Sequence, residues 1–155
     1  IEADLNQTIT ISAEDINEPA LYNWYDLGGN LIFQGKDLQI ANAVAEKYKL
    51  EVIATTDGYK DYKEVEVTLK PSTLENITPN PATNNVEISY KLNQAGSAYL
   101  MIIGYYGSNG TSNNYILDVN SNAINLNINN YPSGFYTVAL VVNGEIVDAK
   151  TLIKQ

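Results

Sequence analysis

The sequence predicts an all-β fold that consists of two consecutive antiparallel β-sandwiches. Short runs in which apolar and polar residues alternate recur along the whole chain, and this period of two is the pattern of half-buried strands. Pairs of Gly, Asn and Asp separate the runs, as turns do. The composition agrees, because 20 Asn, 12 Tyr and 10 Gly among 155 residues are typical of strands and turns rather than of helices.

The first half predicts six or seven short strands. Gly28–Asn30 supplies the positive-φ residues of a hairpin, and Asp57–Gly58 marks a second turn. Trp24 on a mid-domain strand, with a Tyr that opens a late strand, is typical of an immunoglobulin-like (Ig-like) sandwich. We therefore expect residues 1–70 to form an Ig-like spacer domain, which resembles the Ig-like or polycystic-kidney-type repeats of bacterial surface proteins.

The second half predicts a further Ig-like sandwich of about seven strands over residues 77–155. Asn143–Gly144 is the strongest hairpin signal, because both residues readily adopt the positive φ of a type I′ turn. The continuous apolar run Ala98–Ile103 predicts a central strand that is covered on both faces. A polar segment that contains Pro interrupts the strand pattern between the halves, which predicts a linker over residues 71–76.

Residue types that carry much of enzyme chemistry are missing from the sequence. The chain has no Cys and no His, and all nine basic residues are Lys. Thiolate nucleophiles, Ser–His–Asp triads, zinc fingers and iron–sulfur clusters are thereby excluded. The net charge of −9 repels nucleic acid and anionic lipid. We expect no enzyme, no cofactor, no metal site and no nucleic-acid partner.

The ends and the charge distribution suggest a piece of an exported protein. The chain starts at Ile1 without a Met or a signal peptide, so we expect a C-terminal fragment of a longer precursor with a passenger domain upstream. The longest apolar run is too short to span a bilayer, which predicts no direct membrane insertion. Residues 1–70 hold 13 acidic residues and 6 Lys, whereas residues 71–155 hold 5 and 3.

Residues 77–155 carry a series of short motifs in a fixed order. They begin with Pro79-Asn80-Pro81-Ala82 and continue with an alternating strand that ends at Leu92. A Leu126–Tyr136 segment follows that contains Gly134-Phe135-Tyr136, and the chain closes with the strand Lys150–Lys154. Together these motifs resemble the C-terminal sorting domain of the type IX secretion system of the Bacteroidota. The loop Gly104–Gly110 departs from that family's pattern, because it is longer and richer in Gly.

The resemblance implies a transport signal rather than a catalyst. The parent protein would cross the inner membrane, and its folded last domain would be recognised in the periplasm by a shuttle and the outer-membrane translocon. A sortase-like signal peptidase would then cut before the domain, and the passenger would be released or attached at the cell surface. The processing linker would be Lys70, Pro71, Ser72, Thr73 and Leu74.

The same resemblance implies which residues the machinery recognises: Pro79, Asn80, Pro81, Gly134, Tyr136, Lys150, Leu152, Ile153 and Lys154. If the last strand lies at a sheet edge, its backbone can pair with a receptor by strand addition. The alternative reading of the strand is structural, as the closing strand of the sandwich.

Another class of function remains open from the sequence: a pair of carbohydrate-binding or adhesin modules. Trp24, with Tyr22 and Tyr25, would form a sugar-stacking platform. The structural alternative places Trp24 in the core, where the single Trp of an Ig-like sandwich usually packs.

Overall fold

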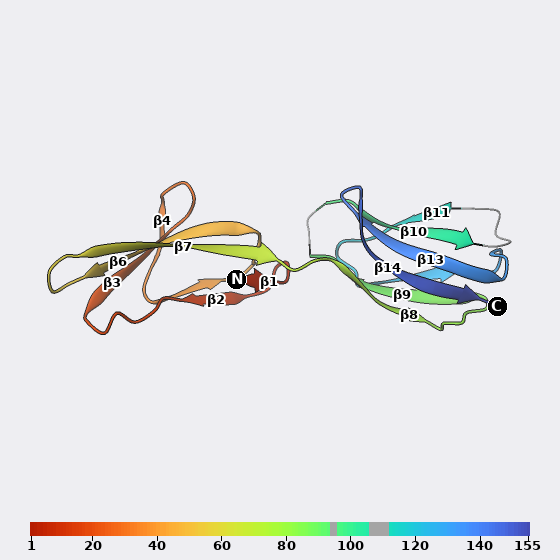
Figure 1. Cartoon of the computed structure of the whole chain (residues 1–155), viewed down its shortest axis with the longest axis horizontal. Coiled ribbons are helices and arrows are strands. Elements are labelled where there is room, and N and C mark those ends of the chain that lie inside the picture. The colour runs from red at the N-terminus through yellow and green to blue at the C-terminus, as the bar shows by residue number, and fades with distance from the viewer. Residues whose placement is uncertain (94–95, 106–111) are drawn as a thin grey trace. The chain divides into compact units, whose positions relative to one another are not determined.

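The computed structural model describes residues 1–93, 96–105 and 112–155, with the backbone alone at Tyr105 (Figure 1). The described residues form 14 strands and no helix. The chain divides into two compact units, Ile1–Lys70 and Pro71–Gln155. The all-β prediction is therefore confirmed, and each unit is described by itself below.

Unit 1 is a sandwich of a larger and a smaller sheet, with strand orders β1-β7-β6-β3-β4 and β2-β5. The short β1 pairs with β7 in parallel, and the other strand pairs of the described unit are antiparallel. Its strands are β1 (Glu2–Ala3), β2 (Ile9–Ser12), β3 (Ala20–Tyr25), β4 (Leu31–Gln34), β5 (Asp37–Ile40), β6 (Glu46–Ala54) and β7 (Lys60–Leu69).

Trp24 is the centre of the unit 1 core. Its side chain is 0% exposed, and its indole Nε1 donates a hydrogen bond of 3.0 Å to the carbonyl oxygen of Gly35. The residues packed with it come from both sheets and include Ile11, Leu38 and Leu50. Because β3 alternates, Trp24 faces inward while Asn23 and Tyr25 face the other side of the sheet.

Unit 2 is a sandwich of a four-stranded and a three-stranded sheet, with strand orders β11-β10-β13-β14 and β12-β9-β8 (Figure 1). The ladders between the described strands of unit 2 are antiparallel. Its strands are β8 (Thr73–Thr78), β9 (Asn85–Lys91), β10 (Ala98–Tyr105), β11 (Ser112–Ile116), β12 (Ala123–Asn127), β13 (Gly134–Val142) and β14 (Glu145–Lys154).

Tyr136 anchors the unit 2 core near the start of β13. It is 2% exposed, and its hydroxyl donates a hydrogen bond of 2.6 Å to the carbonyl oxygen of Pro132. A Tyr at the start of a late strand that bonds back to the preceding segment is a feature of Ig-like sandwiches. Asn143 and Gly144, with φ of 51° and 84°, form the turn between β13 and β14, as their sequence predicts.

The segment expected to be a linker is mostly ordered structure. β8 begins at Thr73, and Ser72 and Leu74 are 2% and 4% exposed. The Ser72 hydroxyl accepts a hydrogen bond of 2.9 Å from the Asn93 backbone, and Leu74 packs in the core. The linker expected over residues 71–76 is therefore corrected for the part that lies in β8, because alternate residues of this polar segment face the core.

Replacing Trp24 by Ala should destabilise unit 1 by about 3–5 kcal/mol, because a large buried side chain and its hydrogen bond are removed from a closed core. Urea unfolding followed by circular dichroism measures the change. Leu21→Ala is the control on the same strand, since Leu21 is 55% exposed, and it should change stability little. Equal stability of the two variants would contradict the placement of Trp24.

Candidate functional site

Three segments that the sequence singles out for recognition meet along the last strand. In the β13–β14 ladder Gly134 stands opposite Lys154, and Tyr136 stands opposite Leu152. On the other edge of β14 lies the segment Asn80–Ala82, which forms a parallel bridge between Ala82 and Lys154. We call the segments Asn80–Ala82 and Thr151–Gln155 together the terminal clamp.

Four hydrogen bonds hold the terminal clamp. The Asn80 side chain makes two of them: its Nδ2 donates to the Thr151 carbonyl oxygen at 2.8 Å, and its Oδ1 accepts from the Ile153 backbone N–H at 2.9 Å. The Ala82 N–H donates to the Ile153 carbonyl oxygen at 2.8 Å, and the Gln155 N–H donates to the Ala82 carbonyl oxygen at 2.9 Å. The end of β14 is thus bonded on both of its edges.

The sequence around Asn80 explains why a side chain takes the place of backbone pairing. Pro79 and Pro81 have no N–H, so neither can donate to β14 as a strand residue would. Both X–Pro bonds here, Thr78–Pro79 and Asn80–Pro81, are cis. The carboxamide of Asn offers a donor and an acceptor together, which matches the carbonyl of Thr151 and the N–H of Ile153. Ala82 is 0% exposed and completes the contact.

The clamp corrects one expectation about recognition. β14 is an edge strand of its sheet, as strand addition would require. The outward backbone groups of Ile153 and the carbonyl of Thr151 are nevertheless already bonded within the unit. A receptor strand cannot pair with these groups unless the clamp opens first.

The predicted recognition residues differ in accessibility. Pro79, Asn80, Pro81 and Lys150 are exposed, and Gly134, Ile153 and Lys154 are half-buried. Tyr136 and Leu152 are 2% and 0% exposed, so their side chains support the fold rather than present a surface. Gly134 has φ of 152°, a conformation that residues with a Cβ rarely adopt.

Sequence reasoning missed Asp148, which links the two sheets of unit 2. Its Oδ2 accepts a hydrogen bond of 2.8 Å from the Leu74 N–H of β8, and its Oδ1 accepts one of 2.8 Å from the Ala149 N–H. The carboxylate thereby ties β14 to β8 and occupies a further amide of β14. A single Asp in an alternating strand carries no sequence signal for such a role.

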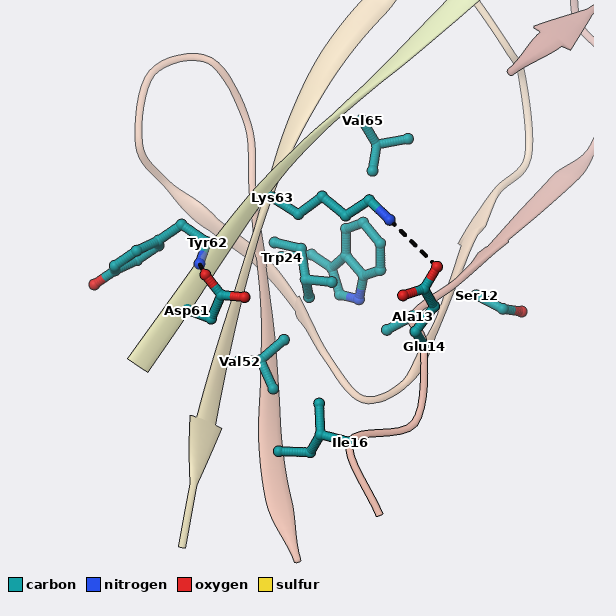
Figure 2. Close-up of a pocket in the computed structure, with 11 residues that line it drawn as sticks. Ser12, Ala13, Glu14, Ile16, Trp24, Val52, Asp61, Tyr62, Lys63 and Val65 are labelled. Carbon is teal, nitrogen blue, oxygen red and sulfur yellow. Dashed lines mark hydrogen bonds and ion pairs between the residues drawn. The ribbon is translucent and has the colours of Figure 1, made fainter. Parts of the chain in front are cut away.

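The expected sugar platform in unit 1 is not assembled. Trp24 lines a crevice of about 110 Å³ together with Val52 and Val65, and its indole lies between these two side chains in the view of Figure 2. Figure 2 also shows Lys63 and Glu14 at the mouth of the crevice, where their charged groups approach to 3.6 Å. A side chain that is 0% exposed has no ring face that can stack on a sugar, which supports the structural alternative that Trp24 packs in the core.

The two Tyr of that predicted platform lie on opposite faces of β3. Tyr22 is half-buried and packs against the core, whereas Tyr25 belongs to a hydrogen-bond network around Glu51 on the outer face. Glu51 is 7% exposed. Its Oε2 accepts hydrogen bonds from Asn23 Nδ2 at 3.0 Å and the Tyr25 hydroxyl at 2.9 Å. Its Oε1 accepts from the hydroxyl of Tyr62 at 2.9 Å and from the ammonium of Lys60 at 3.3 Å.

Hydrogen bonds from Asn23, Tyr25 and Tyr62 stabilise the charged form of Glu51 and lower its pKa to about 2. The four donors to this carboxylate come from its own unit, so the group is structural. Among the described residues, no group of three or more acidic side chains is arranged to hold a metal ion. Within the same residues, no helix is long and apolar enough to cross a membrane.

Comparison with protein families identifies the second unit. The Ig-like β-sandwich is a non-catalytic kind of fold. Residues 76–155 match the family described as "Secretion system C-terminal sorting domain". The chain belongs to this family of type IX sorting domains, whose sorting signal directs export to the cell surface or the extracellular space. The comparison with curated proteins gave no match.

Several solved structures are similar to the chain at low identity. The amphioxus IgVJ-C2 molecule is 11% identical over 100% of both chains, with a TM-score of 0.46. A two-domain fibronectin type-III segment of chicken tenascin is 12% identical over 97% of this chain and 93% of that chain, with a TM-score of 0.48. Titin domains z1z2, solved in complex with telethonin, are 13% identical over 99% and 89%, with a TM-score of 0.49.

Replacing Asn80 by Ala should loosen the terminal clamp, because it removes both side-chain hydrogen bonds. We expect a local loss of roughly 1–2 kcal/mol, which corresponds to amide exchange about 5–30 times faster at Ile153. Hydrogen exchange measured by NMR gives the rate. Asn125→Ala, at an exposed position of β12, is the control. Unchanged protection of Ile153 in Asn80→Ala would contradict the clamp.

Glu51→Gln should destabilise unit 1 by roughly 1–3 kcal/mol at pH 7, because an amide accepts fewer of the four hydrogen bonds. The pKa of Glu51 lies below its ordinary value in the folded unit, so its contribution is complete above about pH 5 and is lost as the pH falls toward 2. The variant should therefore lose less stability than the native chain between pH 7 and pH 3. Fluorescence of Trp24, the single Trp, reports this unfolding in urea. Glu64→Gln is the control at an exposed position of β7, and its stability should depend on pH as that of the native chain does.

Proposed function

We propose that folded unit 2 is the address that the type IX translocon recognises for transport across the outer membrane. The observation that carries the proposal is the meeting of three motif segments along β14. Asn80 and Thr151 are 71 residues apart in sequence and are joined by a hydrogen bond. The address is therefore a property of the folded sandwich, and an unfolded chain does not present it.

The proposed route follows from the family. A passenger domain precedes this chain in the same precursor, which reaches the periplasm, where a shuttle and the translocon receive the folded domain. A sortase-like signal peptidase then cuts before unit 2, and the passenger is released or attached at the cell surface. Within the processing segment Lys70–Leu74, the exposed Lys70 and Pro71 support cleavage near the start of unit 2.

Unit 1 is proposed to be a spacer between the passenger and the address. It has its own core and carries most of the acidic residues, 13 against 5 in the rest of the chain. The carbohydrate-binding alternative loses its platform with the burial of Trp24. An adhesin role has no observation in its favour among the described residues.

A reporter with an inner-membrane signal, fused ahead of the whole chain, should appear at the surface or in the medium of a type IX-competent bacterium. The matched fusion that ends at Lys70 lacks unit 2 and should remain in the periplasm. A third fusion without Lys150–Gln155 should remain there too, because the clamp and the closing strand are removed. Cell fractionation measures all three. Periplasmic retention of the complete fusion would overturn the proposed function.

A further inference from the structure

The outer face of the four-stranded sheet of unit 2 is uncharged and mostly apolar, and its outward polar residues by register are Ser112, Asn114, Thr137 and Thr151. Strands β10, β11 and β13 contain no charged residue. Two of their side chains are widely exposed, Ile116 at 88% and Phe135 at 56%. The name "apolar face" is used below for six outward residues of this sheet: Tyr99, Met101, Ile103, Ile116, Phe135 and Ile153.

Strand register places these six residues on the same side of the sheet. Tyr99 stands opposite Ile116 in the β10–β11 ladder, and Phe135 stands opposite Ile153 in the β13–β14 ladder. The residues that alternate with them, such as Leu100, fill the core and are 0% exposed. Since successive side chains of a strand point to opposite faces, the six residues point outward.

β10 corrects an expectation from the sequence. Its apolar run predicts a strand that is covered on both faces, and it does lie between two other strands. Its inner side chains are buried, but Tyr99, Met101 and Ile103 on the outer side are only half-buried. β10 therefore carries apolar side chains on both of its faces, although only its inner face is buried in the core of the sandwich. Exposed apolar patches of this kind mark interaction surfaces.

The opposite face of the same sandwich has ordinary surface chemistry. The three-stranded sheet places Glu75 on β8, Glu87 and Lys91 on β9, and Asn125 on β12. Asn125 stands opposite Glu87 in the ladder. The contrast between the two faces shows that the apolar character belongs to one sheet and is not a general property of unit 2.

We infer that the apolar face docks on an uncharged, apolar protein surface of the type IX secretion machinery; this inference rests on the proposed function. Continuity with the terminal clamp supports that occupant, because Phe135 and Ile153 lie on the strand ends that hold Gly134 and Lys154. An anionic membrane is a poor occupant, because the face offers no Lys and the chain has a net charge of −9. The partner is held by burial of apolar area, with the clamp presenting the adjoining edge.

The test introduces charge on one face at a time in the complete reporter fusion. Ile116→Lys with Phe135→Lys places two charges on the apolar face at exposed positions. Asn125→Lys with Asn85→Lys adds the same charge to the three-stranded sheet and is the matched control. A second variant, Ile116→Thr with Phe135→Thr, removes the same two apolar side chains without adding charge, and Thr still favours strands. Circular dichroism and the unfolding midpoint of each purified chain report whether it is folded.

We expect the folded Lys pair on the apolar face to lower export at least 10-fold, the Thr pair to lower it less, and the control pair to export normally. If the folded Lys and Thr pairs are both exported as well as the native fusion, the docking inference is overturned while the proposed function stands. If the native fusion itself is retained, the proposed function fails. Sedimentation that shows a dimer lost in both pairs, with export unchanged, would make the occupant a second copy and overturn the inference.

Discussion

The pair of hydrogen bonds made by the Asn80 side chain is the constraint that fixes the last strand of unit 2. They join the start of the sorting domain to its last strand, between two Pro residues that cannot donate to that strand. Exposed strand edges invite pairing with other chains, and native proteins cover them. Here Asn80, Ala82 and Asp148 occupy backbone groups along the edges of β14 and β8. Under the proposed function, recognition therefore uses side chains and the shape of the folded domain.

This arrangement separates the two tasks of the chain. Unit 1 is stabilised by a core around Trp24 and by the carboxylate of Glu51. All four hydrogen-bond donors to this carboxylate are side chains of unit 1. Unit 2 is less charged and exposes an apolar sheet face next to the terminal clamp. For the proposed function, an acidic spacer and a less charged address suit a chain whose second unit is bound while the first stays free.

Sequence reasoning predicted the fold better than the site. Alternation gave the strands and their inward faces, since burial of one sheet face leaves a period of two in residues such as Val86 and Ile88. Turn chemistry located the Asn143–Gly144 hairpin. The first four residues of β8 fall within the linker expected over residues 71–76, because a polar segment that contains Pro hides the strand and its two core residues, Leu74 and Ile77, are separated by an irregular register. Alternation fails where a register shift interrupts it.

For the site, the motifs pointed to the correct segments but not to their contacts. The bonds of Asn80 to β14 and of Asp148 to β8 join residues more than 70 positions apart, and only the fold brings them together. The sequence also could not predict which faces of the sheets are exposed to solvent. A sequence shows that β10 is apolar on both sides, but not that one side lacks a covering layer in the folded chain. Of the segment Gly104–Gly110, where the sequence departs from the family pattern, residues 106–110 lie outside the described residues.

The central claim is that the address exists only while the terminal clamp is closed. A graded series at Asn80 tests it most directly: native Asn, Asp with the acceptor alone, and Ala with neither bond. For each variant, the exported fraction of the reporter fusion is plotted against the hydrogen-exchange protection of the Ile153 amide in the purified chain. The account predicts that export falls in step with protection from Asn to Asp to Ala. Full export of a variant whose Ile153 amide has lost its protection would contradict it.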